Sequence, residues 1–199
     1  MIAIIDYGAG NIFSVKNALD YLGVENKLTA DKNEICAADE IILPGVGAFP
    51  WAMKMLRDSG LVDTIREEAR KPFLGICLGM QLIFDKGYEF EETDGLRLIG
   101  GKVEKIDRKD MIIPHMGWNE LEINRDCPIL KSLPEHPYVY FVHSYAAVCD
   151  DANVSAYCDY GGKITALVHD GAYVYGAQFH PEKSGEVGLQ MLRNFAELA

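Results

Sequence analysis

Short apolar runs alternate with segments of helical periodicity along the first half of this chain, and that order leaves few folds open. The runs 2–5, 41–43 and 73–76 are predicted strands, each followed by apolar residues at helical spacing. Asn11 precedes the first of these helices and is a predicted N-cap. Strands joined through helices pair in parallel by right-handed crossovers, and helices cover both faces of their sheet. The first half therefore predicts an α/β fold.

The second half follows a different pattern. Strands are predicted at 138–142, 154–157, 164–168 and 173–179, separated by tight turns, and a helix is predicted near 186–198. These strands should form a mixed or antiparallel extension, because tight turns join neighbours that run in opposite directions. No linker, repeat or low-complexity segment interrupts the chain. Residues 1–199 are therefore predicted to form one α/β domain with a mixed, mostly parallel central sheet and helices on both faces.

Charge and cysteine content exclude some classes of partner. The 199 residues include 30 acidic and 19 basic side chains, and the net charge of −11 disfavours nucleic-acid and membrane partners. The five cysteines include no CxxC pair, so reduced thiols are predicted. The N-terminal apolar run has no basic flank, which argues against a secretory signal, and a cytoplasmic protein is expected. The acidic run 89–92 is interpreted as solvated surface.

One cysteine lies where a predicted strand ends and a predicted helix begins. In Gly75-Ile76-Cys77-Leu78-Gly79 the two glycines remove side chains that would collide at a sharp turn, as in the G-x-S-x-G nucleophile elbow. A helix N-terminus favours a thiolate, and the amide of Leu78 would point toward an oxyanion formed beside Cys77. A buried structural cysteine is the alternative, and this motif alone does not decide between the two interpretations.

A nucleophilic cysteine needs a base, and the chain offers one near its C-terminus. His180 and Glu182 follow a predicted strand directly, with Pro181 between them. Side chains two apart on extended backbone share a face, and the proline keeps His180 extended. A carboxylate beside an imidazole fixes its tautomer and stabilises the imidazolium. The two segments together predict a triad of Cys77, His180 and Glu182, whereas His180 and Glu182 alone would be interpreted as a surface pair.

Other chemistries find no support in the motifs. The His-x-Glu pair lacks the downstream Pro-Cys-x-x-Cys that holds zinc in deaminases, so no metal is predicted. Gly8-Ala9-Gly10 fails as a dinucleotide loop, because Phe13 occupies the position of the third glycine, and no Walker A sequence is present. The chain is therefore expected to need no cofactor and to bind no phosphorylated substrate by itself.

Cys-x-Gly-x-Gln at 77–81, paired with His-Pro-Glu at 180–182, resembles the motifs of the class I (triad) glutamine amidotransferases, and the resemblance covers essentially the whole chain. Further segments are similar to the glutaminase subunits of imidazole glycerol phosphate synthases of histidine biosynthesis. They are Asp6-Tyr-Gly-Ala-Gly-Asn11, Pro44-Gly-Val-Gly47, His115-Met-Gly-Trp-Asn119, Tyr140-Phe-Val-His-Ser-Tyr145 and Gln178-Phe-His-Pro-Glu-Lys-Ser184. The resemblance implies a flavodoxin-like class I amidotransferase fold with its site at the strand ends.

The resemblance also implies roles for individual residues. Cys77 attacks the carboxamide of L-glutamine, His180 protonates the departing ammonia and then activates water, and Glu182 orients His180. The backbone amides of Val46 and Leu78 form the oxyanion hole. The implied glutamine-binding residues are Gly47, Gln81, His143, Ser144 and Tyr145. The residues implied to contact a partner chain are Asn11, Ser14, Met116, Trp118, Tyr140 and Lys183.

The implied product requires a partner, because free ammonia is mostly protonated in water and ammonium is not a nucleophile. In this family the acceptor is bound by a HisF-type (β/α)8-barrel cyclase, which yields imidazole glycerol phosphate and an aminoimidazole carboxamide ribotide. No barrel is encoded in these 199 residues, so the expected assembly is a heterodimer with a separate chain.

Several alternatives stay open at this level. A hydrogen-bonded core histidine explains His143 as well as a direct ligand does, and Gln81 is compatible with a solvated helix face. Met116 and Trp118 fit core packing as well as an interface. A glutaminase subunit of another synthase, above all a sugar-amidinating one, and a non-catalytic binding module are alternative functions. The resting conformation of segment 44–47, which would aim the Val46 amide, is also open.

Overall fold

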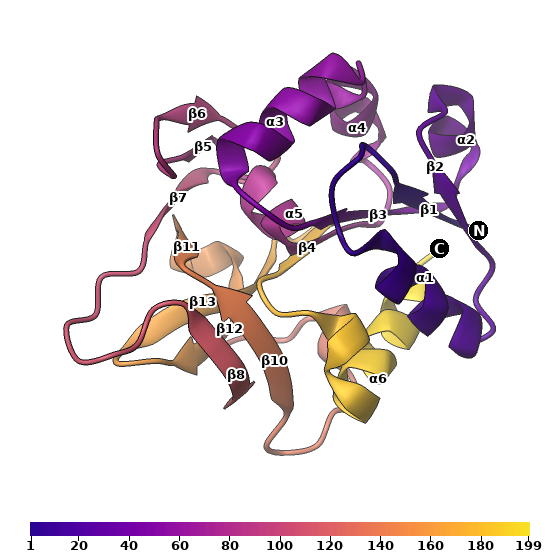
Figure 1. Ribbon diagram of the computed structural model, residues 1–199. Coiled ribbons are helices and arrows are strands. Elements are labelled where there is room, and N and C mark those ends of the chain that lie inside the picture. Colours follow the sequence, from indigo (N-terminus) through magenta and orange to yellow (C-terminus); the bar gives the residue numbers. More distant parts are fainter.

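The computed structural model describes residues 1–199 and is built on an eight-stranded sheet in the order β2-β1-β3-β4-β14-β13-β12-β9 (Figure 1). Five strands of this sheet are parallel: β1 (Ile2–Ile5), β2 (Asn26–Thr29), β3 (Glu40–Gly45), β4 (Phe73–Cys77) and β14 (Val174–Ala177). Three more extend it in antiparallel fashion: β13 (Lys163–His169), β12 (Val154–Asp159) and β9 (Glu122–Ile123). The predicted mixed, mostly parallel sheet is confirmed.

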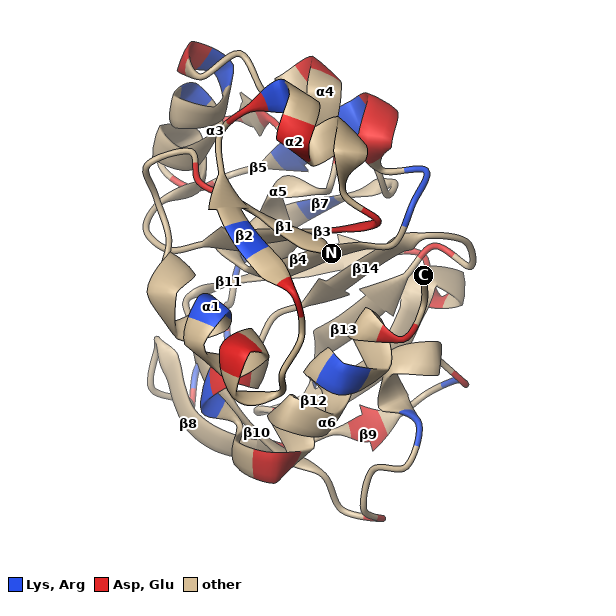
Figure 2. Cartoon of the chain, turned by 90° about the vertical axis from the view of Figure 1, so that its right-hand side faces the viewer, with Lys and Arg blue, Asp and Glu red and all other residues tan.

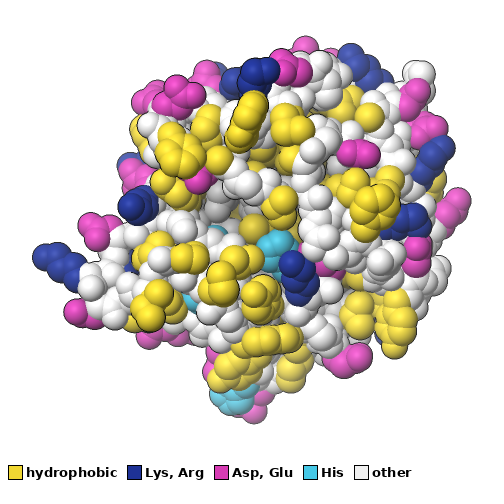
Figure 3. Space-filling model, viewed as in Figure 1, with side chains coloured by type: hydrophobic (Ala, Val, Ile, Leu, Met, Phe, Trp, Pro, Cys, Tyr) yellow, Lys and Arg dark blue, Asp and Glu magenta, His cyan; other side chains and the backbone are white.

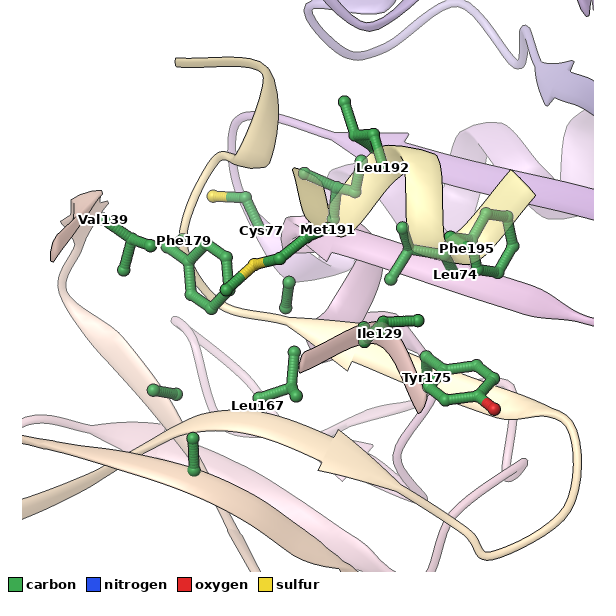
Figure 4. Packing of buried hydrophobic residues seen from close by; sticks show 14 of the residues in the cluster. Leu74, Cys77, Ile129, Val139, Leu167, Tyr175, Phe179, Met191, Leu192 and Phe195 are labelled. Atoms are coloured by element: carbon green, nitrogen blue, oxygen red, sulfur yellow. The ribbon is translucent and has the colours of Figure 1, made fainter. Parts of the chain in front are cut away.

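Helices cover both faces of the sheet (Figure 1). One face carries α1 (Ile12–Tyr21) and α6 (Gly185–Ala196), and the other carries α2 (Lys32–Ala37), α3 (Phe49–Asp58), α4 (Val62–Glu68) and α5 (Leu78–Leu82). Successive strand residues point to opposite faces, so Ile4 joins the core under α1 and α6 while Ile5 joins the core under the other helices. Figure 4 shows Met191, Leu192 and Phe195 of α6 packed near Leu74 and Tyr175 in the first of these cores. None of the helices is long and apolar enough to cross a bilayer.

Two smaller sheets lie beside the antiparallel strands. One pairs β8 (His115–Glu120) with β10 (Tyr138–His143), and the other has the order β11-β7-β5-β6. The strands of the latter are β11 (Tyr145–Cys149), β7 (Gly101–Lys105), β5 (Lys86–Gly87) and β6 (Thr93–Asp94). Short 3₁₀ turns are η1 (Pro128–Leu130), η2 (Asp151–Asn153) and η3 (Pro181–Lys183). The predicted antiparallel meander exists in β12, β13 and β14, whereas the predicted strand 138–142 pairs with β8 instead.

Two local expectations need correction. Asn11 occupies the N-cap position of α1, but its side chain accepts a hydrogen bond from Ser14 Oγ at 2.9 Å and leaves the helix backbone uncapped. The strand predicted at 41–43 is longer in the structure, because β3 continues through Pro44 and Gly45, in register with Ile76 and Cys77 of β4. In the view of Figure 2, acidic and basic residues are interspersed along the chain.

Candidate active site

Cys77 lies on the sharp turn that the sequence predicts. It is the last residue of β4, and α5 begins at Leu78. Its backbone has φ 56° and ψ −111°, a conformation that costs about 1–3 kcal/mol for a residue other than glycine. Strain of this kind persists only where the surroundings hold it, and here the strand and the helix fix both sides of the turn. The side chain is 7% exposed and faces a cavity.

Three glycines make this turn possible, of which the motif indicated two. A Cβ on Gly75 would lie 2.6 Å from the carbonyl oxygen of Gly79, and a Cβ on Gly79 would lie 1.8 Å from that of Leu43. The third is Gly45, where a Cβ would approach the amide nitrogen of Gly79 to 2.7 Å. The start of α5 therefore rests directly on the backbone ends of β3 and β4, and any side chain at these positions would push it away.

His180 and Glu182 converge on Cys77 as predicted. Nδ1 of His180 lies 2.8 Å from Oε1 of Glu182, and His180 lines the same cavity as Cys77, close enough for the thiol to raise the pKa of the imidazole. The local geometry differs from the expectation in one respect. His180 is extended, with φ −102° and ψ 96°, but Pro181–Lys183 form a 3₁₀ turn, so a turn and not a continuous strand brings Glu182 beside the imidazole.

The backbone of His180 is fixed by β10. Its amide donates to the carbonyl of Tyr140 at 3.0 Å, and its carbonyl accepts from Ser184 Oγ at 2.6 Å. Ser184 Oγ in turn accepts the amide of Tyr140 at 3.0 Å. The imidazole position therefore depends on a strand that is distant in sequence.

The electrostatics of the site favour a charged imidazole. Burial by itself would lower the pKa of His180, because the side chain is only 3% exposed. Hydrogen bonds and charge interactions with Cys77 and Glu182 outweigh that penalty and raise the pKa of His180 to about 9. The Glu182 side chain is 1% exposed, so its carboxylate acts on the imidazole with little screening. An imidazolium beside the thiol stabilises the thiolate form that attacks carbonyl carbon.

A cavity of about 350 Å³ opens in front of Cys77. Its walls include all of the residues to which the resemblance gave a role in chemistry or glutamine binding, except Glu182, which lies behind His180. These wall residues are Val46, Gly47, Cys77, Leu78, Gln81, His143, Ser144, Tyr145 and His180. Leu78 is the first residue of α5, so its amide has no partner within the helix. The structure thus brings together segments that are up to 134 positions apart in the sequence, from Val46 to His180.

Gln81 is buried and held in one orientation, which excludes the alternative of a solvated helix face. It is 5% exposed, and its Nε2 donates to the Tyr145 carbonyl and to Gln178 Oε1, both at 3.0 Å. Because a backbone carbonyl only accepts, the amide nitrogen must point that way. The Oε1 atom is left available to a ligand. Gln178 was not singled out from the sequence, and its position two residues before His180 was the only signal.

Glu89 is a wall residue that the sequence did not indicate. It belongs to the acidic run that was interpreted as solvated surface, which is wrong for this residue. Its Oε2 accepts the amide of Phe49 at 2.8 Å, at the start of α3. A carboxylate therefore faces the same cavity as Gln81 Oε1. Nothing in the run 89–92 distinguishes the inward residue, because its three glutamates, at 89, 91 and 92, show no periodic pattern.

The residues implied to contact a partner lie at the start of α1, on β8 and β10, and in η3. Met116 is 61% exposed and Trp118 is 56% exposed, so the core-packing alternative is wrong for both. Trp118 lies edge-on to Tyr140, with ring centroids 6.2 Å apart. Asn11 and Ser14 are half-buried at the start of α1, and Lys183 is exposed. Figure 3 shows hydrophobic side chains gathered over β8 and β10, next to a hollow in the surface.

The fold and this site define a class of enzyme. The sequence model of class I glutamine amidotransferases matches residues 3–198, and the chain belongs to that family. The predicted family and fold are thereby confirmed, together with glutamine amidotransferase activity.

Within the family, the chain is very similar to one kind of protein. It is 51% identical over 197 residues to the imidazole glycerol phosphate synthase subunit HisH of Bacillus cereus, covering 98% of this chain and 93% of the relative. It is 48% identical over 201 residues to the HisH protein of Listeria monocytogenes, covering 100% and 96%. The solved structure of PurLQS from Thermotoga maritima matches with a TM-score of 0.74 at 21% identity, covering 98% of this chain and 96% of that chain, which supports the fold alone.

Proposed function

We propose that this chain is the glutaminase subunit of an imidazole glycerol phosphate synthase, and that it hydrolyses L-glutamine through Cys77. The observation that carries the proposal is the placement of Cys77 and His180 in the wall of one cavity, with the Glu182 carboxylate hydrogen-bonded to the imidazole from behind. A binding module of the same fold would not require all three side chains. The full-length similarity to HisH proteins favours this synthase over others.

The chemistry follows from the positions of these groups. The Cys77 thiolate adds to the carboxamide carbon, and the oxyanion accepts hydrogen bonds from the amides of Val46 and Leu78. The His180 imidazolium protonates the departing nitrogen, which leaves as ammonia and gives a γ-glutamyl thioester. The neutral imidazole then takes a proton from water, which attacks the thioester and releases glutamate. Glu182 keeps the ring oriented through both steps.

Recognition of the amino-acid end of glutamine is assigned to the opposite wall. An α-ammonium group needs acceptors, and Gln81 Oε1 and the Glu89 carboxylate are the acceptor groups on that wall. Ser144 offers a hydroxyl to the α-carboxylate, and Gly47 allows close approach of the backbone. The cavity volume of about 350 Å³ suits a ligand of this size.

The partner is proposed to be a (β/α)8-barrel cyclase bound over β8 and β10. Exposed Met116 and Trp118 give this face the large apolar side chains that are enriched at interfaces. The same face reaches the catalytic imidazole through one residue, since Tyr140 contacts Trp118 and bonds the backbone of His180. Docking against Trp118 can therefore alter the site without direct contact.

Two measurements test the proposal. The purified chain is mixed in turn with a histidine-pathway barrel cyclase and with a sugar-amidinating synthase, and complex formation is measured by analytical ultracentrifugation. Glutamate release is then assayed with each partner. We expect the chain to bind the cyclase but not the other synthase, and to hydrolyse glutamine only in the complex with the cyclase. Hydrolysis supported only by the other synthase would reassign the pathway. No hydrolysis with either partner would refute the proposed glutaminase activity.

A further inference from the structure

Two buried histidines take no part in the chemistry described above: His143 lies in the wall of the glutamine cavity, and His115 lies behind His143. His115 on β8 is 2% exposed and His143 on β10 is 6% exposed. Nδ1 of His115 lies 3.0 Å from Nε2 of His143, and the two residues face each other across the antiparallel pair of strands. A direct contact between two imidazoles requires that one donates and the other accepts, so their tautomers are not independent.

The partners at either end fix both tautomers. Nδ1 of His143 lies 2.8 Å from the carbonyl oxygen of Tyr145, which only accepts, so the proton of His143 is on Nδ1. Nε2 of a neutral His143 is then an acceptor, and His115 must donate to it from Nδ1. This leaves Nε2 of His115 as an acceptor, and Asn119 Nδ2 lies 3.4 Å from it. The hydrogen bonds of this series therefore all run in one direction, from Asn119 through His115 and His143 to the Tyr145 carbonyl.

The orientation of Asn119 agrees with that direction. Its Nδ2 also donates to the Asp159 carbonyl at 2.8 Å, and its Oδ1 accepts the amide of Glu120 at 2.8 Å. The ring of His115 is held between two aromatic rings, with centroids 4.7 Å from Phe141 and 3.9 Å from Tyr160. These neighbours therefore fix both the rotation of the His115 ring and the position of its proton.

At its other end, this series of hydrogen bonds reaches the glutamine-binding wall at Tyr145. The Tyr145 carbonyl accepts from His143 Nδ1 at 2.8 Å and from Gln81 Nε2 at 3.0 Å, which uses both of its lone pairs. Both ring nitrogens of His143 are occupied within the protein, so this ring has no free atom for glutamine. Its contribution to binding acts through the Tyr145 carbonyl, which holds the amide of Gln81.

We propose that His115 and His143 are positioning residues, a neutral imidazole pair that orients the Tyr145 carbonyl and thereby presents Gln81 Oε1 to the α-ammonium of glutamine. This inference rests on the proposed glutaminase function. It makes the affinity for glutamine depend on β8, the strand that also carries the exposed Met116 and Trp118.

A neutral pair suits this location. Burial is the main cause that lowers the pKa of His143, and the charge of the nearby His180 lowers it further, so a second cation there would compete with the imidazolium. Burial lowers the pKa of both His115 and His143 to about 4. The pair thus keeps one set of donors and acceptors at neutral pH.

Two substitutions at His115 separate the hydrogen bond from the packing. His115→Phe keeps a ring between Phe141 and Tyr160 but removes the donor to His143. His115→Asn keeps an amide N–H where Nδ1 was but removes the ring. His169→Phe is the matched control, because His169 is another buried histidine stacked on a tyrosine, at 4.1 Å from Tyr175, and it lies outside the cavity wall.

Glutamine hydrolysis is measured for each variant in complex with the barrel cyclase, together with the melting temperature. We expect the KM for glutamine to rise at least ~10-fold in His115→Phe with kcat changed less than ~3-fold, as for loss of a ground-state binding contact. The Asn variant should melt lower yet keep KM within ~3-fold of wild type, and His169→Phe should keep the wild-type KM. A KM that follows the melting temperature across the three variants, or a normal KM in His115→Phe, overturns the proposal.

A second readout does not depend on glutaminase activity. Nitrogen-15 NMR of histidine-labelled protein reports which ring nitrogen carries the proton. Both His115 and His143 should be neutral at pH 7 with the proton on Nδ1, and His115→Phe should alter the His143 signals. An Nε2 proton on either ring overturns the inference, whereas failure of the wild-type complex to hydrolyse glutamine would refute the proposed function itself.

Discussion

A Cβ on Gly79 would lie 1.8 Å from the carbonyl oxygen of Leu43, so α5 can start where it does only because residue 79 is glycine. The contact joins the helix that follows the nucleophile to the strand that carries the oxyanion segment 44–47. Glycine two residues after Cys77 is therefore a requirement of packing against a neighbouring strand, and the turn at Cys77 depends on that strand as much as on its own φ of 56°. The segment 44–47 and the nucleophile form one unit.

Replacing Cys77 by Ala should abolish glutamine hydrolysis, because the thiolate that forms the thioester is removed. The complex with the barrel cyclase should still form, and synthesis driven by high ammonium at raised pH should continue. Glutamate release and ammonium-dependent product formation are the two measurements. Cys36→Ala, at an exposed free thiol, is the control and should behave as wild type. Glutamine hydrolysis by Cys77→Ala would show that the nucleophile is assigned wrongly.

Glu182→Gln should leave measurable activity and shift its pH dependence, whereas His180→Ala should lose nearly all activity. The Glu182 carboxylate helps raise the pKa of His180 to about 9, so the imidazolium that protonates the departing nitrogen is lost as pH rises through that value. Without the carboxylate charge, the alkaline limb of the rate profile should move to lower pH. Rates of glutamine hydrolysis by the complex between about pH 6 and 10 measure the shift, and an unmoved limb would contradict the role of Glu182.

Gly47→Ala should reduce the stimulation of the glutaminase by the cyclase and its acceptor ligand at least ~10-fold. Gly47 has φ +100°, and an added Cβ would meet no protein atom within 4 Å, so the substitution restricts the backbone without a clash inside the protein. We expect the isolated chain to be a poor glutaminase because the Val46 amide is not aimed at the oxyanion until the partner binds, and a missing donor costs ~100- to 1000-fold.

The control for that prediction is Gly23→Ala, which has φ +71° and equally open space but lies far from the cavity, between α1 and β2. An alanine at either position takes a positive φ. Glutamine hydrolysis is measured for the chain alone, with the cyclase, and with the cyclase plus acceptor ligand, and only Gly47→Ala should change these rates. Equal rates in these three assays for the wild type would refute the switch and leave the triad untouched.

The free energy of unfolding should fall as pH drops from about 6.5 to 4. In the folded protein burial lowers the pKa of His115 and His143 to about 4, while an unfolded histidine titrates near 6.5. Between these pH values the unfolded chain binds protons that the folded chain does not. The contribution of the two histidines to the free energy of unfolding is therefore complete above about pH 6.5 and is lost as pH falls toward 4. The loss is on the order of 2 kcal/mol per histidine at pH 5. Urea unfolding at pH 7 and pH 5 measures it, and His115→Phe should show a smaller difference; an equal difference would contradict the pKa of His115.

The pairing of β10 with β8 was not predicted from the sequence. The strand 138–142 was predicted, but its partner was not, because β8 contains Gly117 and mixes buried with exposed side chains without clear alternation. The pairing brings His115 to His143 across 28 positions, and a hydrogen bond between residues that far apart leaves no local pattern. Glu89 was missed for a related reason, since its side chain is turned into the cavity by the amide of Phe49.

The sequence alone determined the alternation of strands and helices, the elbow at Cys77 and the pairing of His180 with Glu182. Each of these depends on spacing within a few residues, where apolar periodicity, glycine and proline act directly on the backbone. Tertiary structure decided which side chains face the cavity, that Trp118 is exposed, and that Gln81 is held by Tyr145 and Gln178. Those contacts join strands that are distant along the chain, and their geometry is set by the packing of the whole sheet.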